Sequence, residues 1–594
     1  MSNENETIKN GGQWDLGILY DSFDDPKLAA DVDTMRKKID EVNAIAPALA
    51  NMPHKDVLHR YIDLSETISL LSYKLFGYAN LVYATNTSDV NAAGLMGRMQ
   101  AMLSEISASD TVIRHAISAM DDLEDLIATD GTLNEYAFFL RKIKEDSKYL
   151  LSEKEEQVFA LMNISGASAW SDLHSTLTST VSVDYRGEEI PLSAARNLAY
   201  DGDPQVRKDA YEAELACYPK VEKSAAFALN SIKLQVLNEC RLRGFESPLD
   251  QALYSSRMSR KTLDALIGAM NDYMPKFREY LKAKGRALGH ENGLPWYDMF
   301  APMGSLDKKY TVDEAKAYLL GIFGDFDKDL HDMVKRAFEE SWIDFFPRKG
   351  KVGGAFDSGV PSAKQSRVLT NFDGAFGDIV TLAHELGHAF HDQQVFSHSV
   401  IQQDYSMPVA ETASTFNEVL VVSTAIERAE TKEEKLALIE SQLQDANQII
   451  TDIYSRYLFE TSVFDNRDNE FMSPERMCEL MHKAQLASYG DGITEDTLHP
   501  YMWLCKGHYY SGGLSFYNFP YAFGGLFARG LYALYKKQGK DFVPLYKALL
   551  HATSVNNVED TAKMAGIDLT DKAFWCEGLQ SLSDEIDEFI ELTK

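Results

Sequence analysis

Apolar residues recur at helical spacing through most of the chain. In residues 25–180 they fall three, four or seven positions apart, which predicts helices that each turn one stripe toward a core. The clearest stripe is formed by Leu95, Met99, Met102, Leu103, Ile106, Ile113, Ile117 and Met120. Residues 86–89 predict a turn before this helix, and Ser152 with Glu155 predicts a capping box at the start of the next one.

The helical pattern breaks first at residues 181–192. Two short alternating segments flank Arg186-Gly187-Glu188 there and predict a small hairpin. We place a lobe boundary nearby, with residues 1–200 as an N-terminal helical lobe and residues 201–594 as a second lobe. Asp203 and Pro204 then predict the first turn of a long helix that runs toward Asn238.

A second break covers residues 343–370, where phenylalanines, glycines and short apolar runs predict strands and turns. The helical pattern resumes after Gly377 and continues almost to Lys594, with a glycine- and aromatic-rich interruption at residues 507–525. The chain is therefore predicted to be mainly α, with a small β-sheet directly before the helix that follows Gly377.

The length, net charge and apolar content of the chain limit the classes of protein to which it can belong. A chain of 594 residues exceeds the usual size of one hydrophobic core, which agrees with two lobes. The formal net charge of −31 disfavours nucleic acid and anionic membrane as partners, because both need clustered Lys and Arg. No run approaches the roughly 18 apolar residues of a membrane helix, and residues 1–12 are polar, so we expect a cytoplasmic protein.

The cysteines carry no metal or disulfide pattern. They are Cys217, Cys240, Cys478, Cys505 and Cys576. Because they are scattered, odd in number and never at CxxC spacing, they argue against a disulfide framework and against a thiolate zinc site.

The strongest chemical motif is His384-Glu385-Leu386-Gly387-His388. Two histidines four residues apart project from one face of a helix, one turn apart, so both imidazoles can meet one ion. Zinc accepts such nitrogen ligands, and a catalytic zinc site adds a third protein ligand while leaving a position for water. Glu385, next to the first histidine, could take a proton from that water. The alternative is an ordinary helix that carries these three residues by chance, so the context has to decide.

The residues alone leave the third ligand open. The metzincin pattern is excluded because the residue ten positions after His384 is Gln394. Glu411 is the better candidate, and Glu418 shares its helix face seven residues later, although a solvated helix carboxylate is the simpler interpretation of Glu411 alone. His391 lies about 10.5 Å along the helix from His384, too far to join that histidine on one ion. His391 either supports a metal ligand, lies on the substrate side of the motif, or is a histidine whose hydrogen bonds are satisfied within its helix.

Two motifs together resemble a known family. HELGHAFH at residues 384–391, followed by Met407-Pro408-Val409-Ala410 and by ETASTFNE at residues 411–418, is similar to the oligoendopeptidase F branch of the thimet-oligopeptidase-type zinc peptidases. The resemblance implies one Zn²⁺ per chain, bound by both histidines of the HELGH motif and by Glu411. It also implies that Glu385 is the catalytic base.

The segment Gly507-His508-Tyr509-Tyr510 and the aromatic run at residues 516–521 resemble the carboxyl-terminal loop of this family, which supplies donors that face the zinc. We expect Tyr517 first and His508 second as donors to the oxyanion, with Tyr521 and Tyr510 as substrate contacts. The loop departs from the family pattern by a few extra residues after Tyr510, which leaves the identity of the donor open.

Residues 351–359 resemble the family's strand that pairs with the substrate backbone, with Gly354 and Ala355 as the expected contacts. The resemblance implies an elongated, two-lobed helical peptidase with a thermolysin-like HExxH core and a deep channel for short unfolded peptides. Residues 201–594 would form its catalytic domain. The oligomeric state stays open, as do two alternatives: a zinc carboxypeptidase or dipeptidase, and a non-catalytic helical protein with a structural metal.

Overall fold

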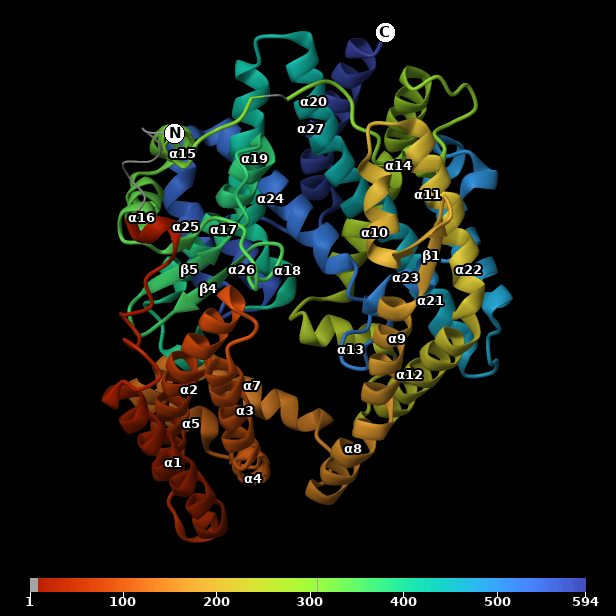
Figure 1. The fold of residues 1–594 in the computed structure, drawn as a ribbon. Helices are drawn as coiled ribbons and strands as arrows, with labels where there is room; N and C mark the ends of the chain where they lie inside the picture. The colour runs from red at the N-terminus through yellow and green to blue at the C-terminus, as the bar shows by residue number, and fades with distance from the viewer. Residues whose placement is uncertain (1–8, 307) are drawn as a thin grey trace.

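The computed structural model describes residues 9–306 and 308–594 (Figure 1). Helices dominate, and the described strands form only two small sheets, so the predicted mainly α fold is confirmed. Among the described residues, none of the helices combines the length and apolar composition needed to cross a membrane. Residues 1–8 of the predicted N-terminal lobe, and residue 307, lie outside the described part of the chain.

The first helices pack around an apolar cluster of their own. They are α1 (Pro26–Ile45), α2 (His54–Thr85), α3 (Val90–Ser104), α4 (Ser107–Ser118), α5 (Leu123–Thr129), α6 (Gly131–Glu135) and α7 (Ala137–Asp146). Met35, Ile39, Leu58 and Leu75 are completely buried in this cluster, which extends to Leu369 of the small sheet. The predicted stripe of residues 95–120 is therefore two helices, α3 and α4, rather than one.

A second group of helices and a hairpin forms another apolar cluster. Its elements are α9 (Ala167–Thr180), β1 (Ser182–Tyr185), β2 (Glu188–Pro191), α10 (Leu192–Asn197), α11 (Pro204–Cys217), α12 (Glu222–Arg243), α22 (Pro474–Tyr489) and α23 (Met502–Cys505). Helix α8 (Glu153–Ser165) contacts α9 but contributes no residue to this cluster. The capping box of Ser152 and Glu155 is confirmed. The hairpin is also confirmed, and its turn residues Arg186 and Gly187 both have positive φ.

One predicted helix was wrong. The segment that begins at Pro204 does not continue to Asn238, because α11 ends at Cys217 and α12 begins at Glu222. Pro219 lies between them, and a proline has no backbone N–H for the helical ladder and crowds the preceding turn.

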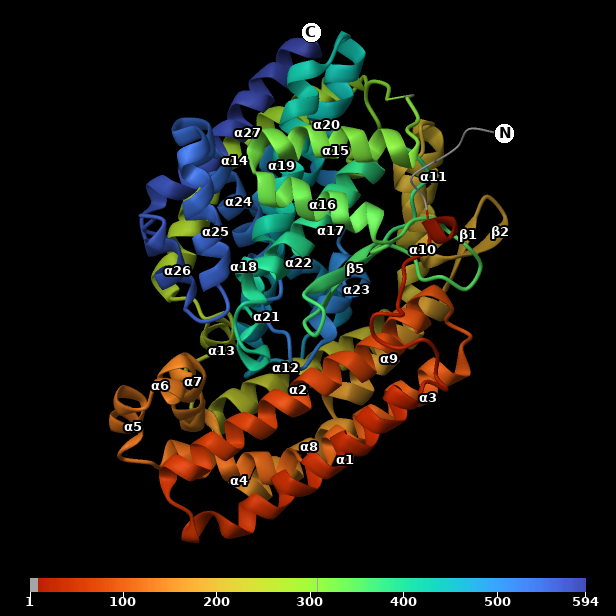
Figure 2. The ribbon, with the colours of Figure 1, turned by 90° about the vertical axis from the view of Figure 1, so that its left-hand side faces the viewer.

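The remaining elements surround the largest apolar cluster, and all of them except strand β4 (Phe356–Val360) contribute buried residues to it. Figure 2 shows the arrangement of these elements. They are α13 (Pro248–Ser255), α14 (Arg260–Ala287), α15 (Val312–Phe326), α16 (Lys328–Glu339), β3 (Ile343–Asp344), β4 (Phe356–Val360), β5 (Gln365–Leu369), α17 (Phe376–Val395), α18 (Met407–Ala410), α19 (Thr412–Arg428), α20 (Lys432–Asn447), the π-helix η8 (Gln448–Asp452), α21 (Ile453–Arg467), α24 (Phe519–Gln538), α25 (Val543–Ala552), α26 (Val558–Met564) and α27 (Lys572–Leu592). Helix α24 begins at Phe519, so the interruption predicted for residues 507–525 ends earlier than expected.

The lobe boundary predicted near residue 200 stays a prediction. In the structure, α9 and the hairpin belong to the same apolar cluster as Cys217 and Tyr218 and as residues from the range 459–510. The N-terminal helices, in contrast, share their cluster with Val360 and Leu369 of the sheet. Residues distant in sequence therefore meet in both clusters.

The predicted sheet before the HELGH motif is confirmed. Its strand order is β3–β5–β4, with β3 parallel and β4 antiparallel to β5. Strand β4 is an edge strand among the described strands, because it pairs only with β5. Both β4 and β5 lie against α17, which places this free edge next to the helix that carries the motif.

Helices α17 and α19 approach closely at Gly387. A Cβ atom at this position would lie 2.5 Å from Ser414 Cα and 2.6 Å from the Ala413 carbonyl oxygen. Asn417 Nδ2 also donates to the Ala383 carbonyl oxygen across the same contact, at 3.2 Å. Because the obstructing atoms are backbone, they cannot move aside as a flexible side chain could.

We expect Gly387→Ala to destabilise the protein by about 1–3 kcal/mol, because the added methyl group must force α17 and α19 apart. Helix propensity alone would predict a gain of about 1 kcal/mol. Gly377→Ala is the matched control on the same helix, since nothing lies within 4 Å of its Cβ position. Urea midpoints of both variants test this expectation, and an unchanged midpoint for Gly387→Ala would contradict it.

Candidate metal centre

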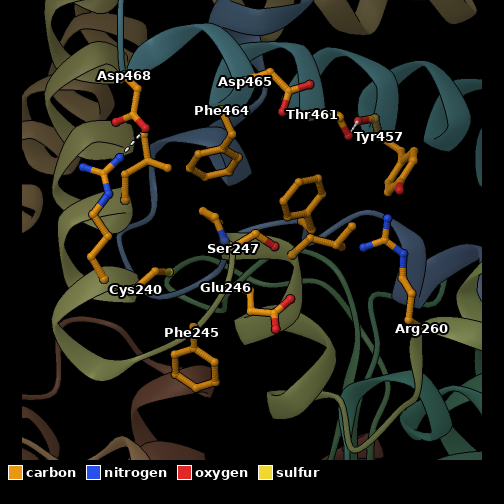
Figure 3. A pocket seen from close by; sticks show the side chains of 15 residues that line it. Cys240, Phe245, Glu246, Ser247, Arg260, Tyr457, Thr461, Phe464, Asp465 and Asp468 are labelled. Atoms are coloured by element: carbon orange, nitrogen blue, oxygen red, sulfur yellow. Dashed lines mark hydrogen bonds and ion pairs between the residues drawn. The ribbon is translucent and has the colours of Figure 1, made fainter.

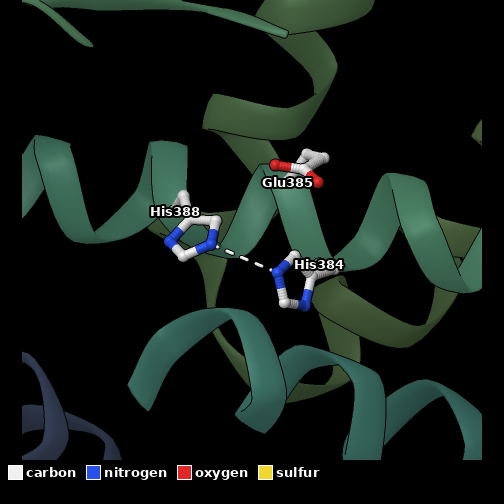
Figure 4. A group of neighbouring side chains, drawn as sticks. All are labelled: His384, Glu385 and His388. Carbon is white, nitrogen blue, oxygen red and sulfur yellow. Dashed lines mark hydrogen bonds between the residues drawn. The ribbon is translucent and has the colours of Figure 1, made fainter. Parts of the chain in front are cut away.

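The HELGH residues lie on the middle turns of α17 (Figure 4). The Nε2 atoms of His384 and His388 are 3.2 Å apart, and the two side chains are 25% and 19% exposed. Glu385 is buried beside them, and the three residues place possible ligand atoms within 4.8 Å of one another. The expected convergence of the two imidazoles is therefore present.

Glu411 closes a triangle with these rings. It precedes α19, and its Oε2 atom lies 3.3 Å from His384 Nε2 and 3.3 Å from His388 Nε2. Three donors bound at about 2.0–2.1 Å to one tetrahedral zinc would be about 3.3 Å apart. The donor types and the size of the triangle therefore fit a zinc ion.

The electrostatics of the triangle favour a cation. Burial lowers the pKa of His384, but hydrogen bonds to Glu411 and Glu418 outweigh it and raise this pKa to about 10. Burial would raise the pKa of Glu411, but hydrogen bonds from His384 and His388 outweigh it and hold this pKa below its ordinary value. The site thus stabilises positive charge next to the Glu411 carboxylate, and a metal ion would supply such a charge.

Two further side chains fix the orientation of the triangle. His384 Nδ1 donates to Glu418 Oε1 at 2.8 Å, which leaves Nε2 facing His388 and Glu411. Ser414 donates its hydroxyl to Glu411 Oε2 at 2.8 Å. The sequence analysis did not identify Ser414, although its position three residues after Glu411, in the first turn of the following helix, could have indicated this contact.

His391 lies in the core behind the triangle. It is completely buried, its Nε2 hydrogen-bonds the Thr553 hydroxyl at 2.8 Å, and its ring stacks on Tyr405 with centroids 4.1 Å apart. Burial and the neighbouring His388 lower the pKa of His391 to about 3. Its Nδ1 is buried without a hydrogen-bond partner among the described residues, so the interpretations from the sequence stay predictions.

The carboxyl-terminal loop brings three of its four predicted residues together. The ring centroids of His508 and Tyr517 are 5.0 Å apart, and those of Tyr517 and Tyr521 are 5.1 Å apart. Tyr521 lines a cavity that also includes His384 and Glu411. Burial and a hydrogen bond with Tyr517 raise the pKa of Tyr521, so its hydroxyl stays protonated and can donate.

Tyr510 is placed differently from the other three. Its side chain is 1% exposed, and its ring stacks on buried His174 with centroids 3.5 Å apart. Tyr510 therefore packs in the second apolar cluster rather than with Tyr517 and Tyr521.

Cavities adjoin the triangle on two sides. One of about 500 Å³ includes His384, His388 and Glu411 and is walled by β4 and the end of α17. The other, of about 640 Å³, includes His384 and Glu411 and is walled by the start of α17 with α19, α20 and α24. A third cavity of about 330 Å³ shares Asp445 and Gln448 with the second, which extends the space away from the triangle.

The predicted strand contacts lie at the first of these cavities. Ala355 lines it directly. Gly354, the residue before Ala355, has a φ of 78°. The Gly354 carbonyl oxygen accepts a hydrogen bond from Asn371 Nδ2 at 2.8 Å. Asp357 and Asp392 also line this cavity, and the sequence carried no signal for them because they come from a strand and a helix 35 positions apart.

Comparison with family models gives two matches. A model described as "Peptidase family M3" matches residues 197–581, and one described as "Oligopeptidase F" matches residues 119–182. The first match covers well over half of the chain and contains the whole triangle.

Individual proteins that this chain resembles in sequence or in fold agree with these family models. Oligopeptidase PepF of Bacillus subtilis is 24% identical over 572 residues, which are 94% of this chain and 85% of PepF. A solved structure from Chlamydophila abortus, described as a peptidase, is 21% identical with a TM-score of 0.81, covering 98% of this chain and 100% of its own. Oligoendopeptidase-F of Enterococcus faecium is 18% identical with a TM-score of 0.67, covering 95% and 97%. The two structures are similar in fold, and the predicted resemblance to oligoendopeptidase F is confirmed.

We expect Glu418→Ala to lower the zinc affinity by about 10- to 100-fold, because His384 loses the partner that fixes its ring and tautomer. Glu427→Ala is the matched control, since Glu427 lies on the same helix with a side chain that is 63% exposed and paired with Lys536. Competition with a zinc chelator measures both affinities. Equal affinities for the two variants would contradict the orienting role of Glu418.

Proposed function

Because the chain belongs to peptidase family M3, a family of peptide hydrolases, we propose that it is a zinc-dependent oligoendopeptidase that cuts internal bonds of short unfolded peptides. The observation that carries this proposal is the triangle of His384, His388 and Glu411, with ligand atoms 3.2–3.3 Å apart and Glu385 beside them.

His384, His388 and Glu411 would hold the zinc ion. A zinc ion supplies two things to peptide hydrolysis when bound: it makes a water molecule more acidic and it polarises the carbonyl of the scissile bond. The chain's own contribution is to hold the imidazoles in a fixed orientation, which Glu418 does for His384 through its hydrogen bond.

Glu385 is the proposed general base. Burial raises the pKa of this carboxyl above its ordinary value, and a carboxylate with a raised pKa takes a proton from water more readily. The same carboxyl then delivers that proton to the nitrogen of the leaving amine. Its place directly after His384 keeps it next to the ligands without joining the triangle.

Tyr517 and His508 are the proposed donors to the oxyanion of the tetrahedral intermediate, with Tyr521 beside them. This role is supported by their clustering and by the position of Tyr521 in the cavity that includes His384 and Glu411. A donor of this kind typically contributes about 2.7–4 kcal/mol to transition-state stabilisation.

The free edge of β4 supports binding of an extended peptide. An edge strand offers unpaired N–H and C=O groups, and a peptide can add to it as a further strand. Ala355 and Gly354 stand at the beginning of this edge. A segment bound there must be unfolded, which agrees with peptides rather than folded proteins as substrates.

Two alternatives explain the same triangle less well. A carboxypeptidase or dipeptidase needs a charged anchor that blocks one end of the cleft, whereas cavities of about 500 and 640 Å³ adjoin the triangle on both sides. A non-catalytic protein with a structural zinc usually supplies cysteine ligands. None of the cysteines belongs to the group of described residues around His384.

Peptides blocked at both termini, of graded length, test the proposed function directly. We expect cleavage of internal bonds in short peptides, loss of cleavage after chelation, and recovery when zinc is returned. Metal analysis should find about one zinc per chain. An exopeptidase would leave every blocked peptide uncut, and a non-catalytic zinc protein would also leave the unblocked ones uncut.

We expect Glu385→Gln to keep its zinc but to lose about 10²- to 10⁴-fold in kcat/KM, because the amide cannot accept the proton. Glu427→Gln serves as the control for loss of a carboxylate elsewhere. Zinc content and cleavage of one blocked peptide are measured on both proteins. Near-normal turnover by Glu385→Gln would exclude it as the base.

A further inference from the structure

Two of the cavities differ in how their charges are balanced. The cavity between α12, α13 and α21 has a volume of about 400 Å³ and carries both signs, with Arg241 paired to Asp468 (Figure 3). The cavity beside β4 has a volume of about 500 Å³, and neither Lys nor Arg is among the described residues that line it. We call the part of it bounded by Asp357, Asp392 and Asp404 the acidic pocket.

Asp357 and Asp392 meet at the centre of the acidic pocket. Asp357 comes from β4 and Asp392 from α17, and their carboxyl groups share a hydrogen bond. Ser366 of β5 donates to Asp392 Oδ2 at 2.8 Å. Gly359 allows this approach, because a Cβ atom there would lie 2.7 Å from the same oxygen. The two carboxyl groups are thus held in place by the sheet.

This pair lacks a balancing cation. None of the described Lys or Arg side chains lies within 4.0 Å of the carboxylates of Asp357, Asp392 or Asp404. Arg257 reaches Asp404 only at its carbonyl oxygen, at 3.4 Å. Burial and the neighbouring Asp392 raise the pKa of Asp357, and burial raises the pKa of Asp392, as expected for two acids without a counterion.

A second observation points independently to a ligand with N–H donors. Gln403 also lines the acidic pocket and is only 9% exposed. Its Nε2 donates to the His398 carbonyl oxygen at 2.9 Å, but its Oε1 has no donor among the described residues. Asp357 Oδ1 is likewise buried without a donor. Buried oxygens of this kind are costly unless a partner arrives.

The walls of the acidic pocket suit an organic cation. Aromatic side chains from three separate segments surround it, namely Tyr73, Phe356, Phe396 and Tyr405. The faces of such rings attract ammonium and guanidinium groups, and their apolar area accepts the methylene stem of a Lys or Arg side chain.

We infer that the acidic pocket selects peptides by binding a cationic N–H group, from a Lys or Arg side chain near the scissile bond or from the peptide's amino terminus. This inference rests on the proposed peptidase function and names its substrate class. The cation would satisfy the unpaired oxygens of Asp357 and Gln403 and balance the charge of the acid pair.

The test compares matched peptides with the wild-type enzyme. Peptides blocked at both ends carry Arg or its neutral isostere citrulline, placed in turn at each position near the scissile bond. A third, citrulline-containing set has a free amino terminus. If the pocket binds a side chain, we expect kcat/KM to be at least about tenfold higher for the Arg peptide than for the citrulline peptide at one position. If it binds the amino terminus, we expect the same difference between citrulline peptides with a free and with a blocked amino terminus. These two results show whether the cationic group that binds comes from a side chain or from the amino terminus.

Variants of the enzyme then test whether the preference for cationic peptides arises from the acidic pocket. Asp357→Asn and Asp392→Asn keep the shapes of the side chains and should reduce the preference at least about fivefold, mainly by slowing cleavage of the cationic peptide. Asp373→Asn is the matched control, because its side chain is 84% exposed and outside the pocket. Calorimetric binding of the same peptides to the Glu385→Gln protein gives a second measurement without turnover.

Equal cleavage of cationic and neutral peptides by the wild-type enzyme would overturn the inference while leaving the peptidase function intact. A preference that survives in both Asn variants would place its origin outside the acidic pocket and would also overturn it. Failure to cleave any blocked peptide is a different result, since it would contradict the proposed endopeptidase function itself.

Discussion

The contact between α17 and α19 at Gly387 is the constraint on which the rest of the site depends. Only a residue without a side chain allows the two backbones to come this close, since a Cβ atom would lie 2.5 Å from Ser414 Cα. This approach brings Glu411 to both imidazoles, and it lets Glu418, two turns further along α19, reach the back of His384. The glycine in the middle of the motif therefore allows the approach that brings the three donors together.

Carboxylates dominate the surroundings of this centre, and their different environments give them different tasks. Hydrogen bonds from two imidazoles hold the pKa of Glu411 below its ordinary value, whereas burial raises the pKa of Glu385, the proposed base. Asp357 and Asp392 lie further along the same cleft, without a counterion. Helix α17, strand β4 and Glu411 before α19 thus bring together the ligand triangle, the proposed base and the acidic pocket.

The part of the site that could be predicted consists of residues that lie close together along the chain. The spacing of His384 and His388 required only a helix, and the resemblance then selected Glu411 as the third ligand and Glu385 as the base from candidates that lie close by in the sequence. The cluster of His508, Tyr517 and Tyr521 followed from one short segment, whereas Tyr510 in the same segment packs on His174, more than 300 positions earlier. Local pattern gives no information on which neighbour a side chain meets across the fold.

The sequence by itself determined the mainly α class, the hairpin at Arg186-Gly187, the short strands before Gly377 and the donor types for zinc, because each depends on periodicity, turn chemistry or residue type. Only the tertiary structure decided the size of the ligand triangle, the burial of His391 and the meeting of Asp357 with Asp392. The physical reason is that these features depend on contacts between distant segments, and such contacts are set by packing rather than by spacing along the chain.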